Sequence, residues 1–286
     1  MTIQVSIHRY ELPILRLLGV IVSAVVVAAC QFSLPRGEAG PGDLGTVTFD
    51  DEFDGPAGSP PDPHHWAPDV GGTGWGNDEL QYYTRTGNTY LDGAGNLVLE
   101  ADRADGPFQC WYGTCDYISG KLTTKYKFSQ RYGVFEARIK GAVGVGLWGA
   151  FWMIGIDIDE AGFPEAGEID VVETLGDRPR DIEQHVQAPG LRWGDEHVLP
   201  AGQSFGDWHI YTVRWTPDRI EWLVDGLSTR SISRAEAGRS WVFDHPFFLL
   251  LNLAVGGEWP GPPNNQTEFP NRMLVDYVRV YALPAG

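Results

Sequence analysis

Residues 209–226 read HIYTVRWTPDRIEWLVDG, a stretch that holds two candidate strands and two candidate turns. The runs HIYTVRW and RIEWLV are rich in β-branched and aromatic side chains, which strands favour. TPD forms a tight turn between the two runs, and Asp225 and Gly226 begin the next turn. The stretch therefore predicts two neighbouring antiparallel strands.

The rest of the chain repeats this alternation of short strand-like runs and turn residues. Its 36 Gly and 20 Pro fall between the runs, no internal repeat or heptad is present, and only Ser233–Arg239 has a brief helical pattern. Many short strands between such turns predict an all-β fold, an antiparallel β-sandwich or jelly roll. The predicted strands are Leu97–Ala101, Lys121–Phe128, Gly133–Lys140, Ala150–Ile154, Ile169–Val172, Trp208–Trp215, Arg219–Val224, Phe247–Val255 and Leu274–Tyr281.

The first thirty residues differ from the rest and predict an export signal. Arg9 and Arg16 supply positive charge, and the thirteen residues Leu17–Ala29 that follow carry none. A spanning helix needs about 20 apolar residues, so a retained transmembrane anchor is the weaker alternative. The tetrad VAAC, which ends at Cys30, resembles a bacterial lipobox, in which the cysteine is lipidated. We expect residues 1–30 to be a lipoprotein-type signal peptide.

The domain layout follows from this reading of the N-terminus. Residues 31–45 are rich in Gly and Pro and predict a flexible tether, and residues 46–284 have the length of one β-sandwich domain. We expect a monomer, exported and anchored to a membrane through its lipid, facing the periplasm or the cell exterior. Once Cys30 is set aside, Cys110 and Cys115 remain as an even pair and predict one small-loop disulfide, with two free thiols as the alternative.

Composition and motifs exclude several classes of protein. The net charge is −17 and no basic stripe is present, so we expect no nucleic-acid partner. The chain has no HExxH metal motif and no GxSxG elbow. Residues 144–149 fit GxGxxG, but the aromatic run AFWMIG follows where a dinucleotide-binding helix would begin. Eleven tryptophans exceed the needs of one sandwich core, so some are expected to line a surface groove, where flat rings stack on sugars.

Three acids alternate with apolar residues in the segment EIDVVE, residues 168–173. Residues two apart on a strand share a face, so Glu168 and Asp170 point to the same side. Glu173 has the wrong parity unless the strand carries a one-residue bulge at Val171 or Val172, and bulges are common beside active sites. With the bulge, all three acids face the same surface.

This spacing predicts a retaining glycosidase. The backbones of Glu168 and Glu173 would be about 13 Å apart, and their side chains could close the gap to about 5–6 Å, as in retaining enzymes. Asp170 can share a proton with Glu168, which leaves Glu168 as the nucleophile, while Glu173 keeps its proton and serves as acid and then base. The alternative is a solvated strand face whose acids only aid solubility.

Several motifs in order resemble glycoside hydrolase family 16, and within it the bacterial laminarinase-like endo-β-1,3-glucanases. The resemblance implies a concanavalin-like jelly roll with a glycan cleft across its concave sheet. It also implies a retaining endo-hydrolase of β-1,3-glucan, such as laminarin, or of mixed β-1,3/1,4-glucan. The motifs are DEFDG from Asp51, WGNDELQYYT from Trp75, YGVFEARIK from Tyr132, GLWGAFWMIG from Gly146, GEIDVVE from Gly167, LLNLAVGGEWPG from Leu250 and VDYVRVY from Val275.

The same resemblance assigns roles to individual residues. It implies that Glu168 is the nucleophile, Asp170 the assisting acid and Glu173 the acid/base. Glu136 and Arg138 lie two apart on a predicted strand and so share a face, although a surface ion pair is the alternative. The positions that match sugar contacts are Asn77, Glu136, Arg138, Trp148, Trp152, His185, Asn252 and Trp259.

No cofactor is required by this chemistry, but the resemblance allows a structural calcium ion. Glu52 and Asp276 are the candidate ligands on the convex face. Two departures from the family pattern, Phe163 in place of a Trp and Gly149 in place of a Pro, fall near the sugar sites and make the β-1,3 preference less secure than retaining hydrolysis. The alternatives are a non-catalytic carbohydrate-binding jelly roll, a family member acting on a galactan, and transglycosylation.

Overall fold

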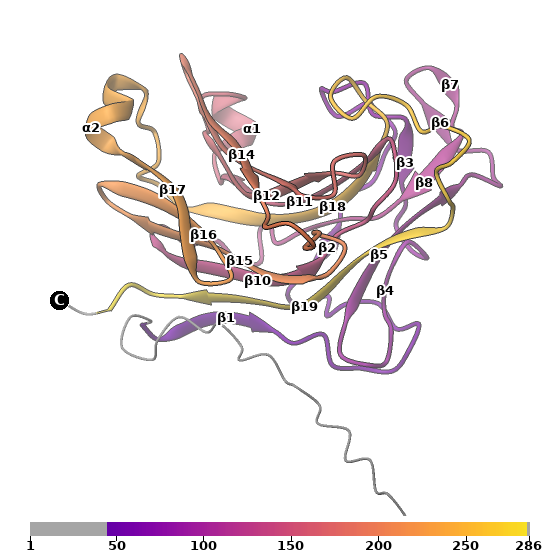
Figure 1. The fold of residues 1–286 in the computed structure, drawn as a ribbon, viewed down its shortest axis with the longest axis horizontal. Coiled ribbons are helices and arrows are strands. Elements are labelled where there is room, and N and C mark those ends of the chain that lie inside the picture. Colours follow the sequence, from indigo (N-terminus) through magenta and orange to yellow (C-terminus); the bar gives the residue numbers. More distant parts are fainter. Residues whose placement is uncertain (1–44, 285–286) are drawn as a thin grey trace, which may run out of the picture. The chain divides into compact units, whose positions relative to one another are not determined.

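The computed structural model describes residues 45–284, which form two curved β-sheets packed face to face (Figure 1). Residues 1–30, which include Cys30, and nearly all of the predicted tether lie outside the described residues. Among the described residues, no helix has the length and apolar character needed to cross a membrane. This is the all-β sandwich predicted from the sequence, with pairing that is antiparallel except between β3 and β8.

The outer sheet has ten strands in the order β17-β16-β15-β10-β19-β5-β8-β3, with β1 beside β19 and β4 beside β5. The strands of this sheet are β1 Val47–Asp51, β3 Gln81–Tyr83, β4 Thr89–Leu91, β5 Leu97–Arg103, β8 Tyr117–Ser119, β10 Gly133–Lys140, β15 Trp208–Thr216, β16 Arg219–Val224, β17 Leu227–Ser233 and β19 Asn271–Tyr281.

The inner sheet has seven strands in the order β14-β13-β12-β11-β18-β9-β2, and its free face is the concave one in Figure 1. The strands of this sheet are β2 Ala67–Pro68, β9 Lys121–Thr123, β11 Leu147–Gly155, β12 Glu168–Leu175, β13 Asp181–Ala188, β14 Leu191–Val198 and β18 Phe247–Val255. The remaining elements are the hairpin β6 Gln109–Cys110 and β7 Gly113–Thr114, the helices α1 Ile158–Ala161 and α2 Arg234–Ala237, and the 3-10 turn η1 Gly238–Ser240.

The core lies between the two sheets and is built from alternate residues of each strand. On β10, for example, Phe135, Ala137 and Ile139 are buried in the main hydrophobic cluster. Trp215 and Trp222 of the outer sheet are fully enclosed there. Burial of a large apolar side chain contributes about 1.5–3 kcal/mol relative to exposure, so this alternation fixes which face of each strand looks inward.

The hairpin of residues 209–226 forms as the sequence predicts, since β15 and β16 pair antiparallel around the TPD turn. Asp225 and Gly226 both have positive φ, 52° and 77°, which suits the two-residue turn into β17. The brief helix predicted at Ser233–Arg239 is present as α2 and η1, and Ser233 caps α2 through Glu236.

The predicted strand Lys121–Phe128 is too long, because β9 ends at Thr123. Thr124 accepts the backbone N–H groups of Lys127 and Phe128 and closes a turn instead. The predicted disulfide between Cys110 and Cys115 is present, and it closes the β6–β7 hairpin.

Candidate active site

The bulge that the sequence predicts in the acidic strand is present at Val171. Along β11, Trp152 is opposite Asp170 and Phe151 is opposite Val172, so Val171 has no partner there. The pairing of β12 with β13 shows the same shift between Asp170 and Glu173. The extra residue returns Glu173 to the face that Asp170 occupies, while Val171 and Val172 stay in the core.

An indole from the opposite sheet supports this bulge. Nε1 of Trp222 donates to the backbone oxygen of Asp170 at 2.7 Å. A bulge disrupts the regular ladder, and a buried carbonyl without a partner is unfavourable. Trp222 therefore satisfies the bulged backbone from within the core, where its ring also packs 5.7 Å from that of Trp193.

Cross-strand register places Glu173, Glu183 and Asp170 in two rows on the concave face, while Glu168 lies in a third row with Ile154 and Gln187. The first row runs across five strands through Lys121, Asn252, Ala150, Glu173 and Glu183. The second row runs through Thr123, Leu250, Trp152, Asp170 and His185.

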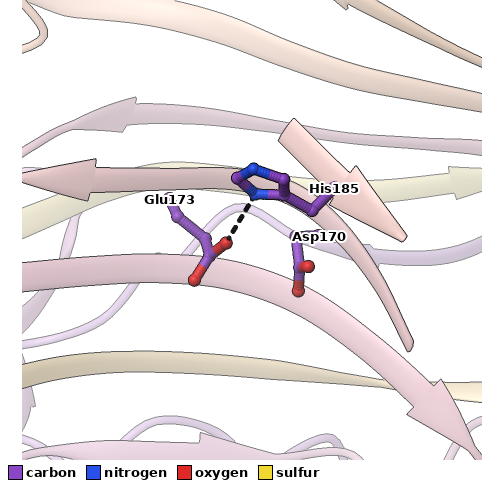
Figure 2. A group of neighbouring side chains, drawn as sticks. All are labelled: Asp170, Glu173 and His185. Atoms are coloured by element: carbon purple, nitrogen blue, oxygen red, sulfur yellow. Dashed lines mark hydrogen bonds and ion pairs between the residues drawn. The ribbon is translucent and has the colours of Figure 1, made fainter. Parts of the chain in front are cut away.

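Two side chains orient the carboxylate of Glu173. Nε1 of Trp148 donates to its Oε1 at 3.0 Å, and Nδ1 of His185 lies 3.2 Å from its Oε2. Figure 2 shows the His185 ring of β13 beside Glu173, with Asp170 nearby on the same strand as Glu173. Nε2 of His185 lies 3.6 Å from Glu183, so the imidazole is itself held between two acids. Both oxygens of Glu173 are thus fixed.

Glu168 and Asp170 differ in their surroundings. Oε1 of Glu168 accepts a 2.6 Å hydrogen bond from Nε2 of Gln187. Asp170 is 3% exposed, and its Oδ2 has no hydrogen-bond partner among the described residues. An enclosed carboxyl without donors favours its neutral form.

Burial and mutual repulsion keep these three acids from ionising together. Burial, followed by the charge of Glu173, raises the pKa of Glu168 to about 8. Burial, followed by the charges of Glu168 and Glu173, raises the pKa of Asp170 well above its usual range. Because these acids interact, they titrate as a coupled group, and the loss of a proton cannot be assigned to one residue alone. The protein without substrate therefore retains protons on Glu168 and Asp170 at neutral pH.

The sugar-contact residues predicted on the inner sheet surround these acids. Nε1 of Trp152 donates to Oδ1 of Asn252 at 2.7 Å, beside Asp170. Trp259 is 41% exposed, and its ring centre lies 5.4 Å from that of Trp148 and 5.8 Å from that of His185.

Asn77 belongs to the loop beside Trp259, because its backbone oxygen accepts from Glu258 N–H at 2.8 Å. Trp148, by contrast, is only 9% exposed. Its structural role is therefore to orient Glu173 rather than to offer an open ring face.

Glu136 and Arg138 do not join this group, which corrects the expectation from the sequence. They do share a face of β10, but that strand belongs to the outer sheet. Glu136 accepts from the hydroxyl groups of Tyr277 and Thr212, and Arg138 pairs with Asp276 at 2.7 Å. Parity predicts which residues share a face, but it does not say which of two sheets provides the strand.

The two acids considered as calcium ligands do not fit that role. Glu52 accepts two hydrogen bonds from Arg279, at 2.7 and 2.9 Å, and Asp276 is committed to Arg138. Among residues 45–284, one group of three candidate ligands has atoms within 4.8 Å of one another, and it is Asp170, Glu173 and His185. Such an oxygen and nitrogen set could coordinate a divalent transition metal, whereas calcium prefers oxygen alone.

Several residues of the site were not predicted from the sequence. Gln187 and Glu183 lie on β13, whose polar pattern did not predict a strand. Trp222 lies in the core between the sheets, on strand β16 of the outer sheet. Lys121 was placed on a predicted strand without a role. The signal for Gln187 and Glu183 is their spacing of two from His185, which places all three on one face once β13 is recognised.

Comparisons with known proteins agree with this geometry. The family model described as glycosyl hydrolases family 16 matches residues 77–279. A beta-glucanase of Rhodothermus marinus is 38% identical over 251 residues, covering 82% of this chain and 84% of that protein.

Two solved structures are similar over most of their length. The laminarinase catalytic domain of Thermotoga maritima superposes with a TM-score of 0.78 at 42% identity, covering 84% of this chain and 98% of that domain. The endo-β-1,3-glucanase of Pyrococcus furiosus gives a TM-score of 0.80 at 41% identity, covering 86% and 97%. With its bulged acidic strand, its sandwich fold and these matches, the chain belongs to glycosyl hydrolases family 16.

Proposed function

We propose that this chain is a retaining endo-glucanase that cleaves β-1,3-glucan, or mixed β-1,3/1,4-glucan, by double displacement. The observation that carries the proposal is the bulge at Val171, which brings Glu168, Asp170 and Glu173 onto one face. A covalent glycosyl-enzyme mechanism requires two carboxyl groups close together that flank the scissile bond, one as nucleophile and one as acid/base.

The reactive form follows from the proton distribution in the triad. Asp170, the most enclosed acid, holds one proton, and Glu168, whose pKa is also raised, holds a second proton. Transfer of this second proton from Glu168 to Glu173 leaves a nucleophilic carboxylate and a protonated acid. Nδ1 of His185, 3.2 Å from Oε2 of Glu173, is placed to accept a hydrogen bond from the protonated acid.

Double displacement then proceeds in two steps, formation of the glycosyl enzyme and its hydrolysis. A carboxylate oxygen of Glu168 attacks the anomeric carbon while Glu173 gives its proton to the glycosidic oxygen, so the leaving glucan departs as an alcohol. Glu173, now a carboxylate, takes a proton from water, whose oxygen attacks the same carbon and releases Glu168. Two inversions retain the anomeric configuration.

The concave face also supports a glycan substrate. Trp259 offers an exposed ring on the Glu173 side, and Trp152 lies beside Asp170 on the other. Flat apolar rings stack on sugar faces, and the β-glucanases among the relatives give the substrate class. A binding module alone would gain little from three crowded acids, two of which, Glu168 and Asp170, are unfavourable to ionise.

Substitution of the two glutamates tests the proposal. Glu168→Ala and Glu173→Ala are each expected to lower kcat on laminarin by about 10²–10⁴-fold or more, because each removes an essential group. Exposed Glu165→Ala is the control and should match the wild type. The measurement is reducing-end release from laminarin, lichenan, curdlan and agarose.

Azide separates the two roles when the substrate carries an activated leaving group. With Glu168→Ala, azide attacks from the vacant face and gives the α-glycosyl azide. With Glu173→Ala, azide captures the glycosyl enzyme and gives the β-glycosyl azide. Full activity of either variant, or the reversed anomers, would contradict the assignment, and activity on agarose alone would move the substrate to galactans.

We further propose that the protein is anchored to a membrane by a lipid on Cys30. The proposal rests on the charged start, the uncharged run Leu17–Ala29 and the VAAC tetrad. In bacterial cells, Cys30→Ser should abolish labelling by radioactive fatty acid and release the protein from the membrane fraction. An unlabelled wild-type protein in the soluble fraction would refute the anchor.

A further inference from the structure

The short hairpin β6–β7 carries two large aromatic side chains at its turn. Cys110 pairs with Gly113, so Trp111 and Tyr112 are the two residues of the turn itself. Hairpin turns of this length usually contain Gly, Asn or Asp. Trp111 is 51% exposed, and its ring centre lies 5.4 Å from that of Tyr112. The hairpin thus presents a large apolar ring to solvent where a small or polar residue is the usual choice.

Two hydrogen bonds fix the orientation of Trp111. Its backbone N–H donates to the backbone oxygen of Gly72 at 2.8 Å, and its indole Nε1–H donates to the backbone oxygen of Glu79 at 2.9 Å. Both acceptors belong to the Asn77 loop, residues 71–80, which is named after the predicted sugar contact that it carries. The indole is therefore held in one orientation although it is exposed.

Gly74 of the Asn77 loop lies under one face of the indole. A Cβ atom at Gly74 would stand 2.9, 3.1 and 3.4 Å from Cδ1, Nε1 and Cγ of Trp111, which is too close for any side chain. Three adjacent ring atoms at such similar distances place Gly74 over the ring face and not at its edge. Gly74 also has a φ of 81°, which favours glycine. One face of the indole therefore rests on backbone, and the exposed surface belongs to the other.

The Asn77 loop connects Trp111 to the cleft. The backbone oxygen of Glu79 holds the indole, and two residues earlier the backbone oxygen of Asn77 accepts the N–H of Glu258 at 2.8 Å. Trp259, the next residue, is the 41% exposed ring beside the reacting acids. In Figure 1 the β6–β7 hairpin rises on the side toward which the inner sheet is concave. Two exposed indoles are thus attached to one loop at the rim of the concave face.

A neutral polysaccharide suits this surface. Flat aromatic rings stack on the apolar faces of sugars, and a ring that is already fixed loses little conformational freedom on binding. The net charge of −17 disfavours a polyanionic chain. A β-glucan that passes Trp259 on its way out of the cleft can reach the second ring without leaving this rim.

We propose that Trp111 is a distal platform, an exposed ring on which the glucan chain stacks beyond the reacting site, held in place by the disulfide-closed hairpin. The inference rests on the function proposed above, which supplies the substrate class. A platform remote from the scissile bond binds the substrate and the transition state equally, so its contribution appears in KM. Only chains long enough to reach Trp111 gain from it.

The test compares three substitutions of Trp111 with a control, all in the full chain. Trp111→Ala removes the ring, Trp111→Leu keeps an apolar cover over Gly74 without a flat ring, and Trp111→Phe keeps a flat ring. Leu227→Ala is the control, because Leu227 is 74% exposed on β17, at the opposite end of the outer sheet from β3. For each, kcat and KM are measured on laminari-oligosaccharides of increasing length and on laminarin, with near-UV circular dichroism to confirm folding.

We expect Trp111→Ala and Trp111→Leu to raise KM on laminarin by about 2- to 10-fold, the size expected for the loss of one aromatic contact. The ratio of kcat/KM on laminarin to kcat/KM on the shortest cleaved oligosaccharide should fall by a similar factor. Trp111→Phe should recover most of this ratio, and Leu227→Ala should match the wild type. The chain length at which the loss first appears measures, in sugar units, how far the platform lies from the cleavage point.

Binding without turnover gives a second measurement. Glu168→Ala and the double variant Glu168→Ala/Trp111→Ala are compared in native gels that contain laminarin. The polysaccharide should retard the double variant less, again by about 2- to 10-fold in apparent affinity.

A purely structural role for Trp111 predicts another result. Equal losses on short and long substrates would overturn the inference, because a disturbed Asn77 loop affects every substrate alike. Unchanged KM and unchanged retardation would overturn it too. If Trp111→Ala failed to fold, Trp111→Leu would decide the question. A wild-type protein inactive on every β-glucan would contradict the proposed function itself, whereas an active wild type whose Trp111 variants keep the wild-type ratio would contradict only the distal platform.

Discussion

At the scale of single residues, Glu168 binds its proton more tightly in the folded protein than in the unfolded chain. Its folded pKa of about 8 lies above the ordinary value of 4.5, mainly because of burial and secondarily because of Glu173. Between these values the native state holds more protons than the unfolded state. The free energy of unfolding therefore falls as the pH rises from 4.5 through 8, and this contribution is fully favourable only below pH 4.5.

Glu168→Gln should remove this dependence, because an amide does not titrate. We expect the variant to gain stability over the wild type as the pH rises from 5 to 9. Each 1 kcal/mol regained should raise Tm by about 2–4 °C for a domain of this size. Thermal unfolding followed by circular dichroism at pH 5, 7 and 9 measures the difference.

Glu165→Gln is the control for this series, since Glu165 is exposed three residues before Glu168. Its Tm difference from the wild type should stay flat with pH. A Glu168→Gln difference that is equally flat would show that the folded protein does not raise the pKa of this carboxyl.

Sequence reasoning at this scale succeeded where local parity decides and failed where long-range pairing decides. The EIDVVE segment contains its own parity conflict, so the bulge and the convergence of three acids were predictable. Glu136 and Arg138 were placed wrongly because no local pattern distinguishes the two sheets. The ammonium of Lys121 lies near the rings of Trp75 and Trp152, which are far from it in the sequence, and only the fold reveals this contact.

At the scale of elements, the contact from Trp222 of β16 to the bulge of β12 links the core to the catalytic strand. Trp222→Phe removes the donor to the Asp170 carbonyl. A buried acceptor left without a partner costs about 1–3 kcal/mol, so the free energy of unfolding should fall by at least this amount. Because the bulge loses its support, we expect kcat to fall about 10-fold or more in folded protein.

Trp215→Phe is a matched control on the neighbouring strand β15. Trp215 is equally buried and donates its Nε1–H to the backbone oxygen of Phe243 at 3.2 Å, away from the acids. It should lose similar stability in a chemical denaturation series while keeping kcat near the wild-type value. Equal kcat in both variants, measured per folded molecule, would show that Trp222 does not position the catalytic strand.

The strands themselves were predictable where apolar residues dominate. Gly133–Lys140, Arg219–Val224 and Phe247–Val255 have the bounds that the sequence predicts. β13 was missed because Gln184 occupies a core-facing position, where Thr229 donates to its Oε1. A hydrogen-bonded polar residue inside the core breaks the alternation on which a strand prediction depends.

At the scale of the whole molecule, the fold class was predictable because short strands between Gly and Pro turns leave few other architectures. The number of strands was not, since small elements such as β6 and β7 exist only through their pairing and the Cys110–Cys115 disulfide. The curvature that makes one face of the inner sheet concave arises from the sheet as a whole and has no signature in any one segment (Figure 1).

Glu168, Asp170 and Glu173 all come from one strand, and this has a consequence for how such a protein can diversify. The spacing of the reacting groups is set by a few bonds of local backbone, not by the docking of separate lobes. Surrounding segments such as the Asn77 loop and the Trp259 loop lie outside that strand and hold to each other through the Asn77–Glu258 contact. They can be exchanged or lengthened to suit another polymer while bond-breaking stays intact, so selectivity and reactivity are separately adjustable traits of this scaffold.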